Sequence, residues 1–144
     1  IKNAIPTCWL LKKVVEEEST YEGAVQRLKN DRIGGPVYFI VSGTKGNEGI
    51  VIERDNDKVH AAMIELNQRF IVQTNYDRDQ PDPVHDFRRL PAEAKLKERG
   101  NKNFKEQDLF DVAMSKFPTL NLETILTVVM VSASGYHNTT VWYG

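Results

Sequence analysis

A change in hydrophobic period constrains the fold of this chain more than any other feature. Up to residue 36, apolar residues recur at the three- and four-residue spacing of a helix, whereas from Val37 to Asn75 they follow the two-residue spacing of strands. Turn-forming residues divide this second region into four short apolar runs. We therefore predict a four-stranded antiparallel meander. Its strands are expected at residues 37–41, 49–54, 60–66 and 70–75.

The residues before this region predict two helices. The first is expected over residues 5–17, with Pro6 in its first turn, where a missing amide proton costs nothing. The second is expected to begin at a capping box formed by Ser19 and Glu22, and to end before the Gly-Gly-Pro sequence at residues 34–36. The apolar stripe of this second helix is predicted to be Ala24, Val25 and Leu28.

The residues after this region predict a loop, two helices and two strands. Residues 76–87 are rich in proline and polar residues, which is typical of a loop. A charged helix is expected over 91–99, ended by Gly100, and a second capping box, Asn103 with Glu106, is expected to start the next helix. We predict a buried strand at 124–131 and an edge strand at 136–143. The side chains expected to face inward from the second helix are Leu109, Phe110, Val112, Ala113 and Phe117.

This order of elements predicts an α+β fold with layered packing and a mostly antiparallel sheet. The length suits a single domain over residues 1–144. Both early strands are apolar on both faces, so we expect the sheet to be covered on both sides.

Composition excludes several functional classes. The formal net charge is −1 and no run of Lys or Arg exceeds two residues, so we expect no nucleic-acid partner. No stretch reaches the roughly 20 apolar residues that cross a bilayer. His60, His85 and His137 share no metal-ligand spacing, so we expect no metal site and no cofactor. One glycosylation sequon, at Asn138, suggests the secretory route, whereas the single cysteine favours a reducing compartment.

Cys8 is the only cysteine. A nucleophilic cysteine needs a nearby base, cation or helix N-terminus to form the thiolate, and none is evident around Cys8. Free cysteine is among the most frequently buried residue types, so we expect Cys8 to be a core residue of the first helix.

A polar cluster at residues 73–78 is the strongest candidate for a site. Asn75 is predicted to end the fourth strand, on the same face as Gln73, and its amide could donate to an oxyanion. Thirteen residues later, Arg88 and Arg89 open a helix and offer guanidinium donors beside the same loop. A turn-forming asparagine followed by solvated arginines would produce the same sequence, so the residues alone leave both interpretations open.

These residues carry a resemblance that covers nearly the whole chain. Residues 70–78, FIVQTNYDR, followed by DFRR at 86–89, resemble the N-Y-D and D-D-R-R signature of the acid ceramidase and N-acylethanolamine acid amidase family. Other segments resemble the same family in the same order. They are residues 6–11, 19–24, 37–43, 48–54 and 109–133.

The resemblance implies an N-terminal-nucleophile hydrolase with αββα layers, of which this chain would be the C-terminal part of the catalytic (beta) subunit. In this family the proenzyme cleaves itself and exposes a cysteine, which attacks a fatty-acyl amide with its own α-amine as the base. Asn75 matches the asparagine that holds the oxyanion, and Arg88 matches the active-site arginine. The nucleophilic cysteine itself would lie upstream of Ile1.

The resemblance also implies partners and a location. The substrate would be a fatty-acyl amide lipid, either an N-acylethanolamine or a ceramide, and membrane-surface contact is expected in a lysosomal enzyme. The N-terminal part of the same proenzyme, meaning the alpha subunit and the start of the beta subunit, would complete the enzyme. The chain departs from the family at Phe87, where an aspartate is usual, and at Lys95, where acid ceramidase has a subunit-linking cysteine. The alternative is a non-catalytic lipid- or protein-binding domain that retains the fold.

Overall fold

The computed structural model describes residues 5–55, 58–63 and 68–143. The chain divides into two compact units, Ile1–Ile71 and Val72–Gly144, which are described separately below. One domain over residues 1–144 therefore stays a prediction. No helix in the described ranges has the length and apolar character needed to cross a bilayer.

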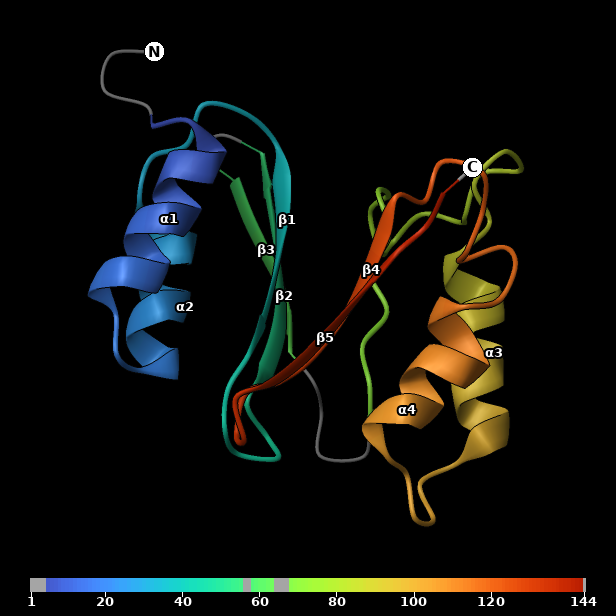
Figure 1. The fold of residues 1–144 in the computed structure, drawn as a ribbon. Coiled ribbons are helices and arrows are strands. Elements are labelled where there is room, and N and C mark those ends of the chain that lie inside the picture. Colours follow the sequence, from blue (N-terminus) through green and yellow to red (C-terminus); the bar gives the residue numbers. More distant parts are fainter. Residues whose placement is uncertain (1–4, 56–57, 64–67, 144) are drawn as a thin grey trace. The chain divides into compact units, whose positions relative to one another are not determined.

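The first unit places two helices against an antiparallel sheet (Figure 1). Helix α1 (Thr7–Glu17) and helix α2 (Tyr21–Asn30) precede the strands β1 (Val37–Ser42), β2 (Gly49–Asp55) and β3 (Lys58–Met63). The sheet order is β1-β2-β3, with Ile40 opposite Val51 and Val51 opposite Ala62. The strands predicted at residues 37–41 and 49–54 are confirmed, and only the β3 part of the run at 60–66 lies in described residues.

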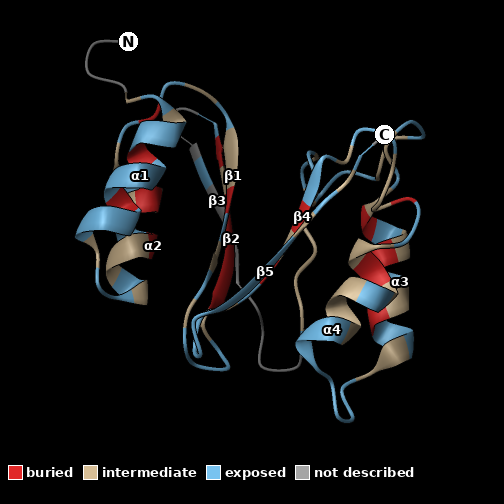
Figure 2. Cartoon of the chain, in the orientation of Figure 1, coloured by how far each residue is buried: buried red, intermediate tan, exposed pale blue. Residues whose placement is uncertain are grey.

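The core of the first unit lies between the helices and one face of the sheet. Its apolar residues on α1 and α2 are spaced three or four positions apart, so they fall on one side of each helix (Figure 2). The opposite face of β1 is not covered by these helices, since Ile40 is 64% exposed. The buried core residues are Leu10, Val14, Val25, Leu28, Ile33, Phe39, Ile50 and Ile52.

Both predicted helix starts in this unit are shifted. Helix α1 begins at Thr7, with Pro6 in extended backbone as its N-cap rather than inside the first turn. The cap of α2 is Thr20, not Ser19, because Thr20 has the extended backbone that an N-cap needs and accepts from the Gly23 amide at 3.1 Å. The predicted stripe of α2 is confirmed: Val25 and Leu28 are buried and Ala24 packs against them.

The predicted fourth strand is wrong. Residues 70–75 form no strand, although their β-branched composition favours one. Several backbone carbonyls in and after this segment accept hydrogen bonds from side chains and not from a neighbouring strand. Arg78 donates to the Val72 carbonyl at 2.6 Å. Gln73 donates to the carbonyls of Thr74 and Tyr76. Residues with high strand propensity form a strand only where a neighbouring strand completes the hydrogen-bond ladder.

The second unit contains a helical layer and a two-stranded ribbon. Helix α3 (Arg89–Arg99) ends at Gly100, whose φ of 62° suits glycine and confirms the predicted stop. Helix α4 (Glu106–Leu109) continues into the π-helix η1 (Phe110–Met114). The strands β4 (Leu126–Val131) and β5 (Tyr136–Val141) pair antiparallel, which confirms the predicted edge strand.

Three details of this unit differ from the sequence prediction. The cap before α4 is at Lys105, whose amide donates to the Asp108 carboxylate, whereas Asn103 has a φ of 53° and lies in a turn. Strand β4 is buried on one face only, because Met130 is 71% exposed. Phe117 is also exposed, while Ala113 is buried as predicted.

Candidate functional site

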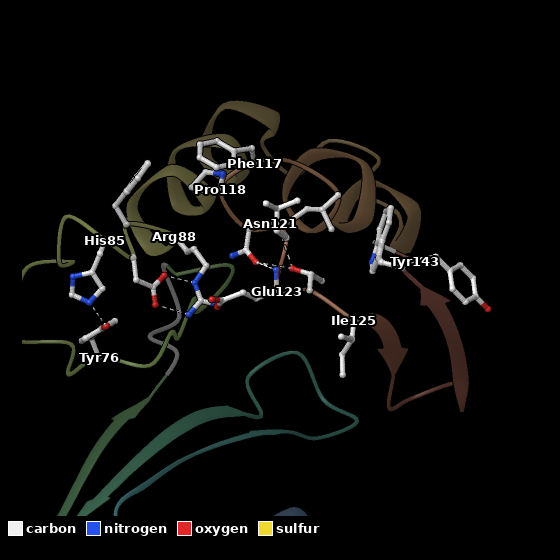
Figure 3. Close-up of a pocket in the computed structure, with 15 residues that line it drawn as sticks. Tyr76, His85, Arg88, Phe117, Pro118, Asn121, Glu123, Ile125 and Tyr143 are labelled. Carbon is white, nitrogen blue, oxygen red and sulfur yellow. Dashed lines mark hydrogen bonds and ion pairs between the residues drawn. The ribbon is translucent and has the colours of Figure 1, made fainter.

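A pocket of about 900 Å³ in the second unit contains the candidate site (Figure 3). It is lined by the loop before α3, the segment between η1 and β4, and the residues that follow β5. Tyr76 and His85 lie at one end, Ile125 and Tyr143 lie at the other, and Arg88 lies between them. The apolar part of the lining includes Phe87, Phe117, Pro118, Leu120, Leu122, Ile125 and Trp142. The lining is therefore mostly apolar, with polar groups at the Tyr76–His85 end and in the middle, where Arg88, Asn121 and Glu123 lie.

The structure brings together the two site residues predicted from sequence. Nη2 of Arg88 donates to Oδ1 of Asn75 at 3.0 Å. Arg88 lines the pocket, whereas Asn75 is an exposed residue beside it and lies in a loop rather than at a strand end. A guanidinium group can only donate, so the amide atom facing it must be the oxygen. In the described part of the chain, the Asn75 amide nitrogen has no acceptor, which leaves its two N–H groups available to a ligand.

Sequence reasoning did not identify Asp86 as a functional residue. Its carboxylate binds Arg88 through both oxygens, Oδ1 to Nε and Oδ2 to Nη2, the latter at 2.7 Å. Such a two-point contact fixes the plane of the guanidinium as well as its position. The orientation of Arg88 is therefore set by Asp86, two residues earlier, although Phe87 stands directly before the arginine. Phe87 instead contacts Phe117 edge to face, with ring centroids 6.0 Å apart.

The Asp86–Arg88 pair shifts both pKa values. The hydrogen bond from Arg88 holds the pKa of Asp86 below its ordinary value, and partial burial opposes this only in part. The same bond raises the pKa of Arg88. Both groups thus remain charged in mildly acidic solution.

This shift predicts how stability depends on pH. A carboxylate whose pKa is lower in the folded state stabilises the fold above its unfolded pKa of about 4, and loses that contribution as pH falls through the folded value. The difference in unfolding free energy between wild type and Asp86→Asn should therefore be constant from pH 7 to about 5 and shrink below about 4. Urea denaturation of both proteins across this range measures it. A difference that already shrinks between pH 7 and 5 would contradict the assignment.

A second pair occupies the polar end of the pocket. The Tyr76 hydroxyl and Nε2 of His85 are 2.9 Å apart, and the two rings meet edge to face. Both side chains line the pocket, so this end offers hydroxyl and imidazole groups to a polar ligand.

Arg89 differs from its neighbour Arg88 in burial and partners. It forms an ion pair with Asp82 at 2.9 Å, and the two side chains are only 7% and 2% exposed. Arg89 also donates to the carbonyls of Asp77 and Gln80. The interpretation of both residues as solvated arginines is therefore wrong: Arg89 anchors the loop that carries the site.

The remaining candidates lie elsewhere. Cys8 is exposed on α1, so its prediction as a core residue is wrong: Leu10 and Val14 occupy the helix side that faces the core. His137 is exposed on β5, and the side chain of His60 lies outside the described residues. In the described ranges, no three His, Cys, Asp or Glu residues cluster as metal ligands would. Nζ of Lys95 donates to the Phe117 carbonyl at 2.8 Å.

Comparisons with known proteins agree with the family resemblance. No family model matches the chain. The chain is 34% identical over 144 aligned residues to the N-acylethanolamine-hydrolyzing acid amidase of Caenorhabditis elegans, an alignment that covers 95% of this chain and 40% of that protein. It is 36% identical to the acid ceramidase of Mus musculus, covering 88% of this chain and 33% of that one. The chain thus spans two fifths or less of the length of these relatives.

A solved structure gives the same result. The Caenorhabditis elegans N-acylethanolamine-hydrolyzing acid amidase (NAAA) ortholog matches with a TM-score of 0.81 and 33% identity, covering 96% of this chain and 62% of that chain. The match confirms the predicted fold class, an α+β fold of the N-terminal-nucleophile hydrolase type with antiparallel sheets.

Proposed function

Because this chain belongs to the acid ceramidase and N-acylethanolamine acid amidase family, we propose that it is part of a fatty-acyl amide hydrolase that cleaves an amide C–N bond. The nucleophile is an N-terminal cysteine contributed by a part of the protein outside these 144 residues, and the present chain is the C-terminal part of the catalytic subunit. The substrate is an N-acylethanolamine or a ceramide.

The observation that carries this proposal is the Arg88–Asp86 ion pair in a largely apolar pocket. Arg88 lies between the end formed by Tyr76 and His85 and the end that carries Ile125 and Tyr143, and most of the lining is apolar. A fatty-acyl amide has the same distribution of polarity, because its carbonyl separates a polar amine portion from a long acyl chain. Pockets with mostly apolar walls and few oriented polar groups are typical ligand sites.

The proposed roles follow from the charge that develops during acyl transfer. Attack by the cysteine converts the planar carbonyl into a tetrahedral oxyanion. The Asn75 amide donates to that oxygen, and Arg88 holds the amide in place. One preorganised donor at such an oxygen contributes about 3 kcal/mol to lowering the barrier.

The proposal extends to location and partners. Both relatives carry the word "acid" in their names, and the lowered pKa of Asp86 keeps the Arg88 contact intact in acidic solution. We therefore place the enzyme in the lysosome, reached by the secretory route, with Asn138 on exposed β5 as the glycosylation site. The partner of this chain is the N-terminal part of the same proenzyme, to which it is covalently joined before the proenzyme is cleaved. Membrane-surface contact is supported by Leu122 and Tyr143, two almost fully exposed apolar side chains of the pocket lining.

A second candidate function is a lipid- or protein-binding domain that retains the fold without catalysis. The observation that favours it is that no cysteine is among the described residues that line the pocket. The upstream coding sequence separates the two candidates. A cysteine that opens a strand, followed by an arginine and an aspartate, is expected for the enzyme.

The direct test is hydrolysis by the full-length protein. We expect release of fatty acid from an N-acylethanolamine or a ceramide at acidic pH, abolished when the N-terminal cysteine of the mature subunit is replaced by alanine. Lipid binding without hydrolysis by the correctly processed protein would favour the binding domain.

Residues 1–144 expressed alone should have no amidase activity, because none of the described residues that line the pocket carries a thiol nucleophile. Incubation of the purified chain with a fluorogenic acyl amide measures this, and Cys8→Ser serves as the control. Hydrolysis that disappears in Cys8→Ser would make Cys8 the nucleophile and overturn the proposed role of an upstream cysteine.

A further inference from the structure

We propose that Asp86 is a positioning residue: it fixes the guanidinium of Arg88, and through it orients the Asn75 amide with its N–H groups toward the reacting carbonyl. This inference rests on the proposed function, because it assigns how the oxyanion donor is held. The observation behind it is a continuous hydrogen-bonded chain from Asp86 to Arg88 to Asn75.

The chemistry of the three groups allows only one arrangement. An ionised carboxylate only accepts, through both of its oxygens, and a guanidinium only donates. Arg88 must therefore present N–H groups to both neighbours, and Asn75 must turn its oxygen toward Arg88. The Asn75 amide nitrogen then faces away from Arg88, with both protons available. Without Arg88, the oxygen and nitrogen of the asparagine could exchange places by rotation of the amide.

Arg88 needs a partner to hold this position. An arginine side chain is long and loses considerable rotamer freedom when it is fixed. Asp86 supplies two contacts, and the two side chains are 28% and 20% exposed, so solvent competes with the pair only in part. The intervening Phe87 turns to Phe117 and has no group that could replace the carboxylate.

A direct proton-transfer role for Asp86 fits less well. The hydrogen bond from Arg88 holds the pKa of Asp86 low, so the group remains ionised at the mildly acidic pH where the enzyme is proposed to work. Both of its oxygens are already occupied by Arg88. A group in this state orients a neighbour, whereas a general acid needs a proton to give.

The test is a double-mutant cycle in the full-length enzyme with an N-acylethanolamine as substrate. Asp86→Asn should lower kcat by roughly tenfold to a hundredfold, the range expected when a reacting group is slightly misplaced, with little change in KM. In an Asn75→Ala background the same change should cost no more than about twofold, because the oriented amide is already absent. Asp79→Asn, an exposed carboxylate of the same loop, is the matched control and should leave kcat unchanged.

The outcomes separate positioning from a structural role. Equal loss of kcat from Asp86→Asn in both backgrounds, or no loss in either, would overturn the proposal. Crystal structures of the wild-type and Asp86→Asn full-length proteins provide a second readout that needs no activity: the Arg88–Asn75 hydrogen bond should be present in the first and absent in the second. If the wild type hydrolyses no acyl amide, the proposed function fails, and this comparison still decides whether Asp86 orients Asn75.

Discussion

Replacing Asn75 with alanine in the full-length enzyme is expected to lower kcat by about a hundredfold or more, with KM nearly unchanged. The substitution removes a donor that binds the oxyanion and contributes little to binding of the ground-state carbonyl. Asn75 is exposed, and its side chain contacts Arg88 rather than the apolar core, so the melting temperature should change little. Steady-state kinetics and a thermal melt on the same protein measure both effects.

Asn75→Asp is the sharper variant of this experiment. Aspartate keeps an oxygen that can accept from Arg88, but it has no N–H group to donate. If Asn75 acts as a donor, aspartate should be at least as damaging to kcat as alanine while it preserves the contact with Arg88. An enzyme with normal kcat and a lowered melting temperature after either substitution would show instead that Asn75 is a structural turn residue.

The first unit was the easier part to predict, because local rules and packing agree there. The three-to-four spacing of Leu10 and Val14, and of Val25 and Leu28, matches the side of each helix that packs on the sheet. The helix starts were shifted because several neighbouring residues can act as caps. Ser19 and Thr20 are both suitable, and the backbone conformation selected Thr20.

The segment before the site shows where sequence patterns fail. Residues 70–75 have the composition of a strand, but a strand also needs a neighbour, and no composition rule specifies one. The donor groups of Asn75 indicate its chemistry, whereas its predicted place at the end of a strand is wrong. What fixes its side chain is Arg88, a residue 13 positions later.

The different roles of Arg88 and Arg89 could not be predicted from sequence. Arg88 and Arg89 are adjacent and chemically identical, yet one lines the pocket and the other is buried against Asp82. Their roles depend on which way the first turn of α3 faces. Asp86 was missed for a related reason, since a carboxylate two residues before an arginine is a common surface pattern.

Loss of the Arg89 side chain is expected to produce the largest effect on stability. Arg89→Met leaves Asp82 buried without its counter-charge and removes the donors to the carbonyls of Asp77 and Gln80. Breaking a buried pair from one side costs about 3–5 kcal/mol. Urea denaturation of the full-length protein should show this as a lower midpoint, and catalysis should fall as well, because the anchored loop carries the site.

Lys97→Met on the same helix provides the matched control. Lys97 pairs with Glu93 at 3.5 Å, but its side chain is 68% exposed, so its loss should change the unfolding free energy by no more than about 0.5 kcal/mol. Combining Arg89→Met with Asp82→Leu should recover part of the loss, since no lone charge then remains buried. Recovery should be incomplete, because Asp82 also accepts from the Leu90 amide in the first turn of α3. Equal stability losses for Arg89→Met and Lys97→Met would mean that solvent reaches Arg89 and that another contact anchors the loop.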